Sequence, residues 1–376
     1  MKILLYIGHH KVGSTSLQAF FSQNWLALAR AGILYPGVEA EGFADHLQRG
    51  LSGRDSTELP QVNVREPHNA LAFRMMSSVT GKPMPPYHRN LPALGQMLKA
   101  LRQQVSLMAP QTLVICSEVM ANFGPLAPKL IDQLKAQFPE AEFEIYCVLR
   151  RPDQYLASWH GQRLKFGHKV KALNDGGALA YEKGIHFNYK ALLEPWIARF
   201  PEARLHLRNY ADVLAAGGSV EDFTRSVGVD FPEGLQQPER TNPSLPYAAY
   251  EIMRRANHVL ARPEQLELRK YLLKSARKLP ANTEVELFGA ALRAELAEAF
   301  AATDRYLSQF AAGGAFFADL AQMRAPHPLP EAEALERSLA ILQAAPPRSA
   351  ALRQFLQSFG QHAKPPLWRR VRPLQK

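Results

Sequence analysis

The chain has 376 residues, which is enough for one large domain with an extension or for two domains. Hydrophobic residues make up 47% of it and charged residues 21%, proportions that are ordinary for a globular protein. The formal net charge of +11 favours anionic partners, such as nucleotides, sulfated or phosphorylated glycans, nucleic acid or a membrane surface.

The two cysteines, Cys116 and Cys147, each lie in an apolar run typical of a strand, which indicates buried, reduced thiols and argues against a disulfide or metal framework. No segment approaches the ~20 apolar residues that a membrane span requires. The chain begins directly with a predicted strand and shows no charged leader, long apolar segment and cleavage site. These features predict a cytoplasmic protein.

The first predicted element is an apolar run, Ile3–Ile7, typical of a buried strand. After a loop with two glycines, apolar side chains recur at helical spacing, and Gly32 is a typical end for that helix. Residues 36–90 are interpreted as an irregular insertion with one short helix at Ala70–Ser77. Such a long insertion is more typical of a binding lid than of a passive connection.

From there on, apolar runs alternate with helical patterns. The predicted elements are a helix at Leu91–Leu107, a strand at Thr112–Cys116, a helix at Pro128–Phe138, a strand at Glu144–Leu149, a helix to about Phe166, a helix at Tyr189–Phe200, a strand at Arg204–Leu207 and a helix at Val220–Val227. This alternation predicts a three-layer α/β/α fold with a central parallel sheet. Beyond about Pro246 the pattern is helical with no convincing strand, so we expect a nucleotide-binding domain over 1–260 and a helical extension over 261–376.

The loop after the first strand resembles a Walker A phosphate loop whose lysine is displaced. A Walker A loop reads G-x-x-x-x-G-K-[ST], and this chain has Gly8-His-His-Lys-Val-Gly13-Ser14-Thr15. Ser14 stands where the lysine belongs, and Lys11 lies three residues upstream. Between a strand and a helix, the backbone N–H groups of such a loop form an anion cradle. The same arrangement without a ligand would be a simple strand-to-helix turn.

A second polar segment follows the strand at Glu144–Leu149. Arg150 leaves the strand, Pro152 starts a helix, and Ser158 lies eight residues after the arginine. An arginine supplies a fork of donors and a serine adds a hydroxyl, so the pair suits one phosphate. Because ligands of open α/β sheets bind outside the carboxyl ends of the strands, we expect Arg150, the phosphate loop and Ser117-Glu118 at one edge of the sheet.

Together, these segments resemble the sulfotransferases that use 3′-phosphoadenosine 5′-phosphosulfate (PAPS). Their K-x-G-[ST]-[ST] loop binds the 5′-phosphosulfate, and their R-x-P-x(5)-S element binds the 3′-phosphate. The matching residues here are Lys11, Gly13, Ser14, Thr15 and Ser16 for the loop, and Arg150, Pro152 and Ser158 for the second element. The resemblance covers roughly residues 1–260 and leaves the C-terminal part unexplained.

The resemblance implies PAPS as co-substrate, with no metal required, and a hydroxyl acceptor that needs a general base. Lys11 would stabilise charge on the leaving phosphate. Glu118 is the first candidate base, although a carboxylate at this position could also simply cap a helix. His46 is the second, because histidines serve as bases in some sulfotransferase branches, although it could also be an ordinary surface histidine. Asn242 would close over the nucleotide from a late loop, although a turn at Pro243 also explains it.

The predicted function is in-line sulfuryl transfer from PAPS to a hydroxyl acceptor, a glycan in preference to a lipid or a tyrosine. The alternatives are a P-loop kinase or NTPase with a displaced lysine, and a non-catalytic nucleotide-binding protein. Nucleic acid is not expected as a partner, because no nucleic-acid-binding motif occurs. The segment 347–376 has seven basic residues and no acidic one, which suits either peripheral contact with anionic lipid or a solvated terminus.

Overall fold

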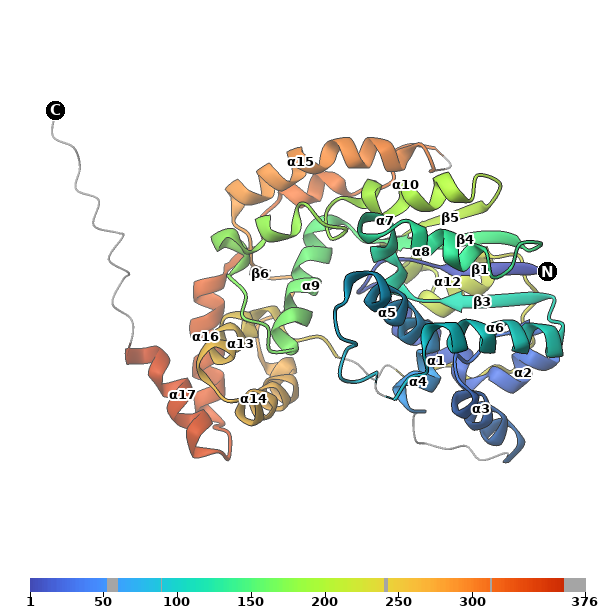
Figure 1. Ribbon diagram of the computed structural model, residues 1–376. Helices are drawn as coiled ribbons and strands as arrows, with labels where there is room; N and C mark the ends of the chain where they lie inside the picture. Colours follow the sequence, from blue (N-terminus) through green and yellow to red (C-terminus); the bar gives the residue numbers. More distant parts are fainter. Residues whose placement is uncertain (53–59, 89, 240–242, 312, 362–376) are drawn as a thin grey trace. The chain divides into compact units, whose positions relative to one another are not determined.

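The computed structural model describes residues 1–52, 60–88, 90–239, 243–311 and 313–361 and contains a five-stranded parallel sheet (Figure 1). The strand order is β2-β3-β1-β4-β5. The strands are β1 (Lys2–Tyr6), β2 (Ile33–Leu34), β3 (Thr112–Cys116), β4 (Glu142–Leu149) and β5 (Arg204–Asn209). Helices flank this sheet, so the predicted α/β fold with a parallel sheet is confirmed at that level.

The central strands form because their sequences are almost entirely apolar. Ile3–Tyr6 of β1 and Leu113–Cys116 of β3 are at most 1% exposed, as are Ile145–Leu149 of β4. Strands that are buried on both faces read as continuous apolar runs, which is why the sequence located them well. Cys116 and Cys147 are free, buried thiols within these strands, as predicted.

The chain divides into two compact units, and the sheet belongs to the first. That unit takes the described residues within Met1–Leu156, Ala180–Thr241 and Ala294–Met323. The second takes those within Ala157–Leu179, Asn242–Arg293 and Arg324–Lys376. The units therefore interleave along the chain, whereas the sequence suggests a single division near residue 260.

The segment 36–90 is more helical than the sequence predicted. The short helix expected at Ala70–Ser77 is confirmed as part of α5, but α3 and α4 were not predicted, and the three helices occupy most of the described part of this segment. The helices of the first unit are α1 (Ser14–Gln23), α2 (Trp25–Arg30), α3 (Ala40–Ser52), α4 (Val62–Arg65), α5 (Pro67–Thr80), α6 (Leu94–Met108), α7 (Phe123–Leu126), α8 (Lys129–Lys135), α10 (Tyr189–Arg199), α11 (Tyr210–Ala215) and α12 (Ser219–Ser226).

The predicted helix after the phosphate loop is interrupted at Asn24, between α1 and α2. The Asn24 side chain donates to the carbonyl of Phe20 at 2.8 Å and to that of Gln236 at 2.9 Å, and it accepts from the Gln236 N–H at 2.8 Å. An asparagine that bonds to backbone groups in this way competes with helix continuation. The helical pattern of the sequence could not predict this break, because the contact that accompanies it is made with Gln236, 212 residues away.

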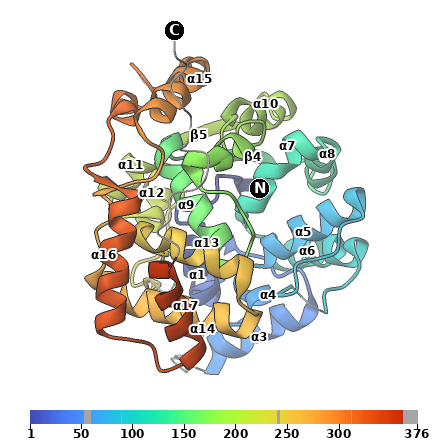
Figure 2. The ribbon, with the colours of Figure 1, turned by 90° about the vertical axis from the view of Figure 1, so that its left-hand side faces the viewer.

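The second unit is mainly helical, as Figure 2 shows for α13, α14, α16 and α17. It also contains a short parallel pair of strands, so the prediction of no strand beyond Pro246 was wrong. Two-residue strands are too short to leave a periodic signal. The elements are α13 (Tyr250–Val259), α14 (Arg262–Ser275), β6 (Val285–Glu286), β7 (Leu329–Pro330), α16 (Glu331–Ala344) and α17 (Ala350–Gln361), while α9 (Pro152–Lys165) and α15 (Ala290–Ser308) each contribute residues to both units.

None of the helices in the described part of the chain combines the length and apolar character needed to cross a membrane.

The backbone beyond β1 stays bonded to β4 and runs very close to it. The N–H of Ile7 donates to the Tyr146 carbonyl at 3.1 Å, and that of His9 donates to the Val148 carbonyl at 3.2 Å. Gly8 lies between them, and a Cβ there would come within 2.5 Å of the Val148 nitrogen and 3.1 Å of the Cys147 Cα. Only glycine fits where two backbones approach this closely.

We therefore expect Gly8→Ala to lower the free energy of unfolding by about 2 kcal/mol or more, because the atoms that it meets are backbone atoms that cannot rotate away. Urea denaturation checks the value. Gly95→Ala is the matched control: a Cβ at Gly95, in the first turn of α6, meets nothing within 4 Å, so this variant should be neutral or slightly more stable. Equal stability of Gly8→Ala and the wild type would show that β1 and β4 are not this close.

Candidate functional site

Polar residues from three strand ends lie along one edge of the sheet. β1 pairs with β3 and β4, with Tyr6 opposite Cys116 and opposite Tyr146. The phosphate loop, Glu118 and Arg150 each follow one of these strands within a few residues. The predicted shared edge is thus confirmed, and β1 lies at its centre, where the order of connections reverses.

The loop closes on α1 through two left-handed residues, Lys11 with φ 62° and Gly13 with φ 89°. The hydroxyl of Ser219 occupies the space that a Cβ at Gly13 would need, and it donates to the Val12 carbonyl at 3.1 Å. No side chain caps the start of α1. The amides of its first turn, at Ser14 and Thr15, have no intrahelical acceptor, so they are placed to bind an anion.

His9 is a structural support of this loop. Its ring is buried, lies 3.7 Å from the Tyr155 ring in a stacked arrangement, and has Nε2 3.0 Å from the Ile185 carbonyl oxygen. Burial lowers its pKa well below the usual range, and burial with the charge of Lys11 lowers the pKa of His10 to about 4. Both rings are therefore neutral at pH 7, and the positive charge of the loop comes from Lys11.

Glu118 lies next to the first two turns of α1. Its Oε2 accepts from Gln18 Nε2 at 3.2 Å and its Oε1 accepts from Asn69 Nδ2 at 3.3 Å, while the nearby side chain of Ser14 favours the charged form of the carboxylate. Burial, and then the charge of Glu66, raise its pKa to about 7. A carboxyl group with this pKa accepts a proton readily near neutral pH, as a general base must.

The supports of Glu118 were missed at the sequence level. Asn69 Nδ2 also donates to Glu66 Oε2 at 3.2 Å, and Asn69 Oδ1 accepts from Ser117 Oγ at 2.7 Å. Glu66 and Asn69 belong to the start of α5, in the segment that was taken for an irregular insertion. Gln18 could have been found, because it lies four residues after Ser14 and so shares its face of α1.

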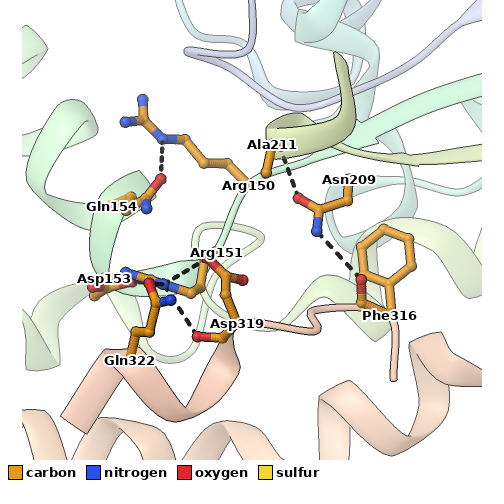
Figure 3. A network of polar contacts seen from close by, with 9 residues as sticks. All are labelled: Arg150, Arg151, Asp153, Gln154, Asn209, Ala211, Phe316, Asp319 and Gln322. Atoms are coloured by element: carbon orange, nitrogen blue, oxygen red, sulfur yellow. Dashed lines mark hydrogen bonds and ion pairs between the residues drawn. The ribbon is translucent and has the colours of Figure 1, made fainter. Parts of the chain in front are cut away.

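The adjacent arginines Arg150 and Arg151 have different roles (Figure 3). Arg151 is buried and binds both oxygens of Asp153, at 2.8 and 3.1 Å, and Asp319 at 2.7 Å. The Arg150 guanidinium points away from these ion pairs, with only a long 3.4 Å bond to Gln154. Among the described residues no carboxylate pairs with Arg150, so its charge remains available to a ligand.

Two tyrosines hold Arg150 in place. Tyr189 Oη donates to its carbonyl at 2.7 Å, and the guanidinium lies 5.2 Å from the centre of the Tyr210 ring. A guanidinium on an aromatic face keeps its N–H groups free for hydrogen bonds in its own plane. Arg150 is thus fixed at its base and against a ring, while its guanidinium has no carboxylate partner among the described residues.

The remaining predicted residues are more scattered. His46 is buried on α3 and stacked on Trp25 at 5.5 Å, and burial lowers its pKa to about 4; its described contacts do not join it to the loop. It is not a surface histidine. Thr15 and Ser16 lie in the first turn of α1, as predicted. Ser158 is buried on the part of α9 that belongs to the second unit, and Asn242 lies outside the described residues.

Comparison with known proteins assigns no function. No family model and no solved structure matches the chain. A protein of Archaeoglobus fulgidus described as an uncharacterized protein is 33% identical over 120 residues. The match spans 31% of this chain and 31% of that protein, less than two thirds of either. The functional argument therefore rests on the residues themselves.

The raised pKa of Glu118 has a consequence for stability. The folded protein keeps this proton up to about pH 7, whereas the unfolded chain releases it near the ordinary value of 4.5. Between these values the native state binds more protons, so this group's contribution to the free energy of unfolding falls as pH rises.

We expect Glu118→Gln to lose less stability than the wild type between pH 5 and pH 8, measured by urea denaturation. Exposed Glu140→Gln should follow the wild type; parallel curves for all three proteins would contradict the raised pKa.

Proposed function

We propose that this protein transfers a sulfuryl group from PAPS to a hydroxyl acceptor. The observation that carries the proposal is that two separate cationic elements share the sheet edge with Glu118: the uncapped start of α1 with Lys11, and the guanidinium of Arg150, which has no acidic partner among the described residues. A nucleotide with phosphates on both its 5′ and 3′ positions needs two such elements. A nucleoside triphosphate needs one.

The chemistry follows from the residues at this edge. A bond forms between the acceptor oxygen and sulfur while the bond from sulfur to the bridging phosphate oxygen breaks, leaving adenosine 3′,5′-bisphosphate. Glu118 takes the acceptor's proton, and Lys11 stabilises the charge that develops on the leaving phosphate. The amides of Ser14 and Thr15 hold the 5′-phosphate, and Arg150 binds the 3′-phosphate.

Several parts of this proposal come from the sequence motif alone. They are the contact of Ser158 with the 3′-phosphate, the contact of Asn242 with the nucleotide, the hydroxyls of Thr15 and Ser16 as phosphate ligands, and a glycan as acceptor. His46 is the weaker candidate for the base. Its ring is packed against Trp25, and burial lowers its pKa to about 4, so it has little tendency to take up a proton at neutral pH.

Nucleotide binding tests the proposal before the acceptor is known. Adenosine 3′,5′-bisphosphate at 100 times its Kd should raise Tm by about 3–5 °C, with or without Mg²⁺. ADP, which lacks the 3′-phosphate, should shift Tm much less at the same concentration. Mg²⁺-dependent stabilisation by ATP, with no preference for the 3′-phosphate, would overturn the proposal and select a P-loop NTPase. Transfer of the labelled sulfuryl group from PAPS to an acceptor would then distinguish an enzyme from a non-catalytic nucleotide-binding protein.

Arg150→Ala tests the second anion element. Losing a charged hydrogen-bond partner of the 3′-phosphate should weaken adenosine 3′,5′-bisphosphate about 10- to 100-fold in titration calorimetry and leave ADP nearly unchanged. Arg204→Ala, which removes an exposed arginine from the opposite end of the sheet, is the matched control and should change neither. Equal weakening of both ligands by Arg150→Ala would remove this residue from the 3′-phosphate site.

Lys11→Ala tests the transition-state role of the loop lysine. If Lys11 acts mainly on charge that develops during transfer, turnover of PAPS should fall about 100- to 1000-fold while Kd for adenosine 3′,5′-bisphosphate rises far less. Lys99→Ala, an exposed change on α6, serves as the control. A loss of affinity as large as the loss of turnover would make Lys11 a binding residue only.

A further inference from the structure

The side of Glu118 away from the phosphate loop is built from a second carboxylate. Asn69 donates to both Glu118 and Glu66, at 3.3 and 3.2 Å, and so holds the two acidic groups side by side. Arg65 binds Glu66 through Nη2 at 2.7 Å and Nε at 3.2 Å, so its charge is engaged within the cluster. Any molecule that presents a hydroxyl to Glu118 must approach this pair.

Gln18, on α1, is a second residue that holds the Glu118 carboxylate in place. Gln18 donates its amide nitrogen to Glu118 and to the Cys116 carbonyl, at 3.2 Å each, which turns its Oε1 away from both. This oxygen is fully buried and has no partner among the described residues. The Gln18 amide therefore acts as a donor that holds the carboxylate, and the oxygens left to accept from a bound molecule are those of Glu118 and Glu66.

An exposed aromatic ring packs on α5, the helix whose first turn carries Asn69 and which directly follows Glu66. Tyr87 is 49% exposed, yet its ring is held by His88 at 4.9 Å and Phe73 at 6.4 Å. Phe73 lies four residues after Asn69 on α5, so it shares the face of the helix from which Asn69 contacts the two carboxylates. Burial, and then the charges of Glu66 and Glu118, raise the pKa of Tyr87. His88 is buried, with Nδ1 2.8 Å from Asn63 Oδ1 and an unpartnered Nε2.

From this arrangement we propose that the acceptor is an uncharged polyhydroxyl compound, a neutral sugar, that packs on the Tyr87 ring and donates hydroxyl groups to Glu66 and Glu118. Several O–H donors satisfy a row of oxygen acceptors, and the apolar face of a pyranose suits a held aromatic ring. A uronic acid or a sulfated sugar would bring a negative charge against Glu66, an unfavourable like-charge contact in a partly buried place. The proposal rests on the proposed sulfuryl transfer.

Paired acceptors that differ only at C6 test the proposal. The probes are p-nitrophenyl β-glucoside against β-glucuronide, and β-galactoside against β-galacturonide, each with labelled PAPS and the full chain. We expect each neutral glycoside to be sulfated with at least tenfold higher kcat/KM than its uronide. Glu66→Gln should reduce that ratio several-fold, and Tyr87→Ala should raise KM for the neutral glycosides with less change in kcat. Glu140→Gln, an exposed carboxylate before β4, should leave the ratio unchanged.

Binding of the same glycosides, followed by saturation-transfer NMR with adenosine 3′,5′-bisphosphate present, covers the case of slow turnover. Uronides that bind or react as well as the neutral glycosides, or binding by none of the neutral ones, overturns the inference. So does a ratio that survives Glu66→Gln unchanged in correctly folded protein, as judged by circular dichroism. If the wild-type protein does not bind adenosine 3′,5′-bisphosphate at all, the proposed sulfuryl transfer itself is overturned. This result distinguishes failure of the proposed function from failure of the inference about the acceptor.

Discussion

The arrangement of the site depends on the backbone contact between the segment after β1 and the strand β4. Ile7 and His9 continue the hydrogen bonding of the sheet past the end of β1, and Gly8 allows the two backbones to approach. The loop therefore leaves the sheet at a fixed point and in a fixed direction. Because β4 also leads directly to Arg150, one backbone contact sets the position of the phosphate loop relative to that arginine.

The neighbours of the charged groups at this edge give each group different surroundings. Arg151 takes up the nearby acidic groups, Asp153 and Asp319, and so leaves Arg150 without an acidic partner among the described residues. The histidines of the loop stay neutral because they are buried, so Lys11 is not accompanied by further positive charge. A cluster of like-charged groups would have shifted pKa values and weakened one another. Here the different roles of Arg150 and Arg151, and of Lys11 and the two loop histidines, follow from which of these side chains are buried and paired.

The sequence predicted the parts of the site that are local. The buried strands, the glycine spacing of the loop and the positions of Glu118 and Arg150 follow from short segments whose residue types are restricted by burial or by backbone geometry. Asn69 and Glu66 could not be placed, because the bond from Asn69 to Glu118 joins residues 49 positions apart and Glu66 is linked to Glu118 through Asn69. The sequence predicted a helix at Ala70–Ser77, but α5 begins at Pro67, so Asn69 fell just before the predicted start. The distinction between Arg150 and Arg151 likewise depends on Asp319, far along the chain.

Ser14 connects the two halves of the proposed reaction. In the structure the Ser14 side chain lies close enough to Glu118 to lower its pKa, while the motif assigns the same hydroxyl to the 5′-phosphate. A serine hydroxyl has one proton to donate, so it cannot serve both anions at once. If it turns to the phosphate, Glu118 loses a donor that favours its charged form, and it becomes a stronger base. The free energy of binding the phosphate would thus be used in part to prepare the carboxylate for the acceptor's proton, which links occupation of the cradle to the chemistry beside it.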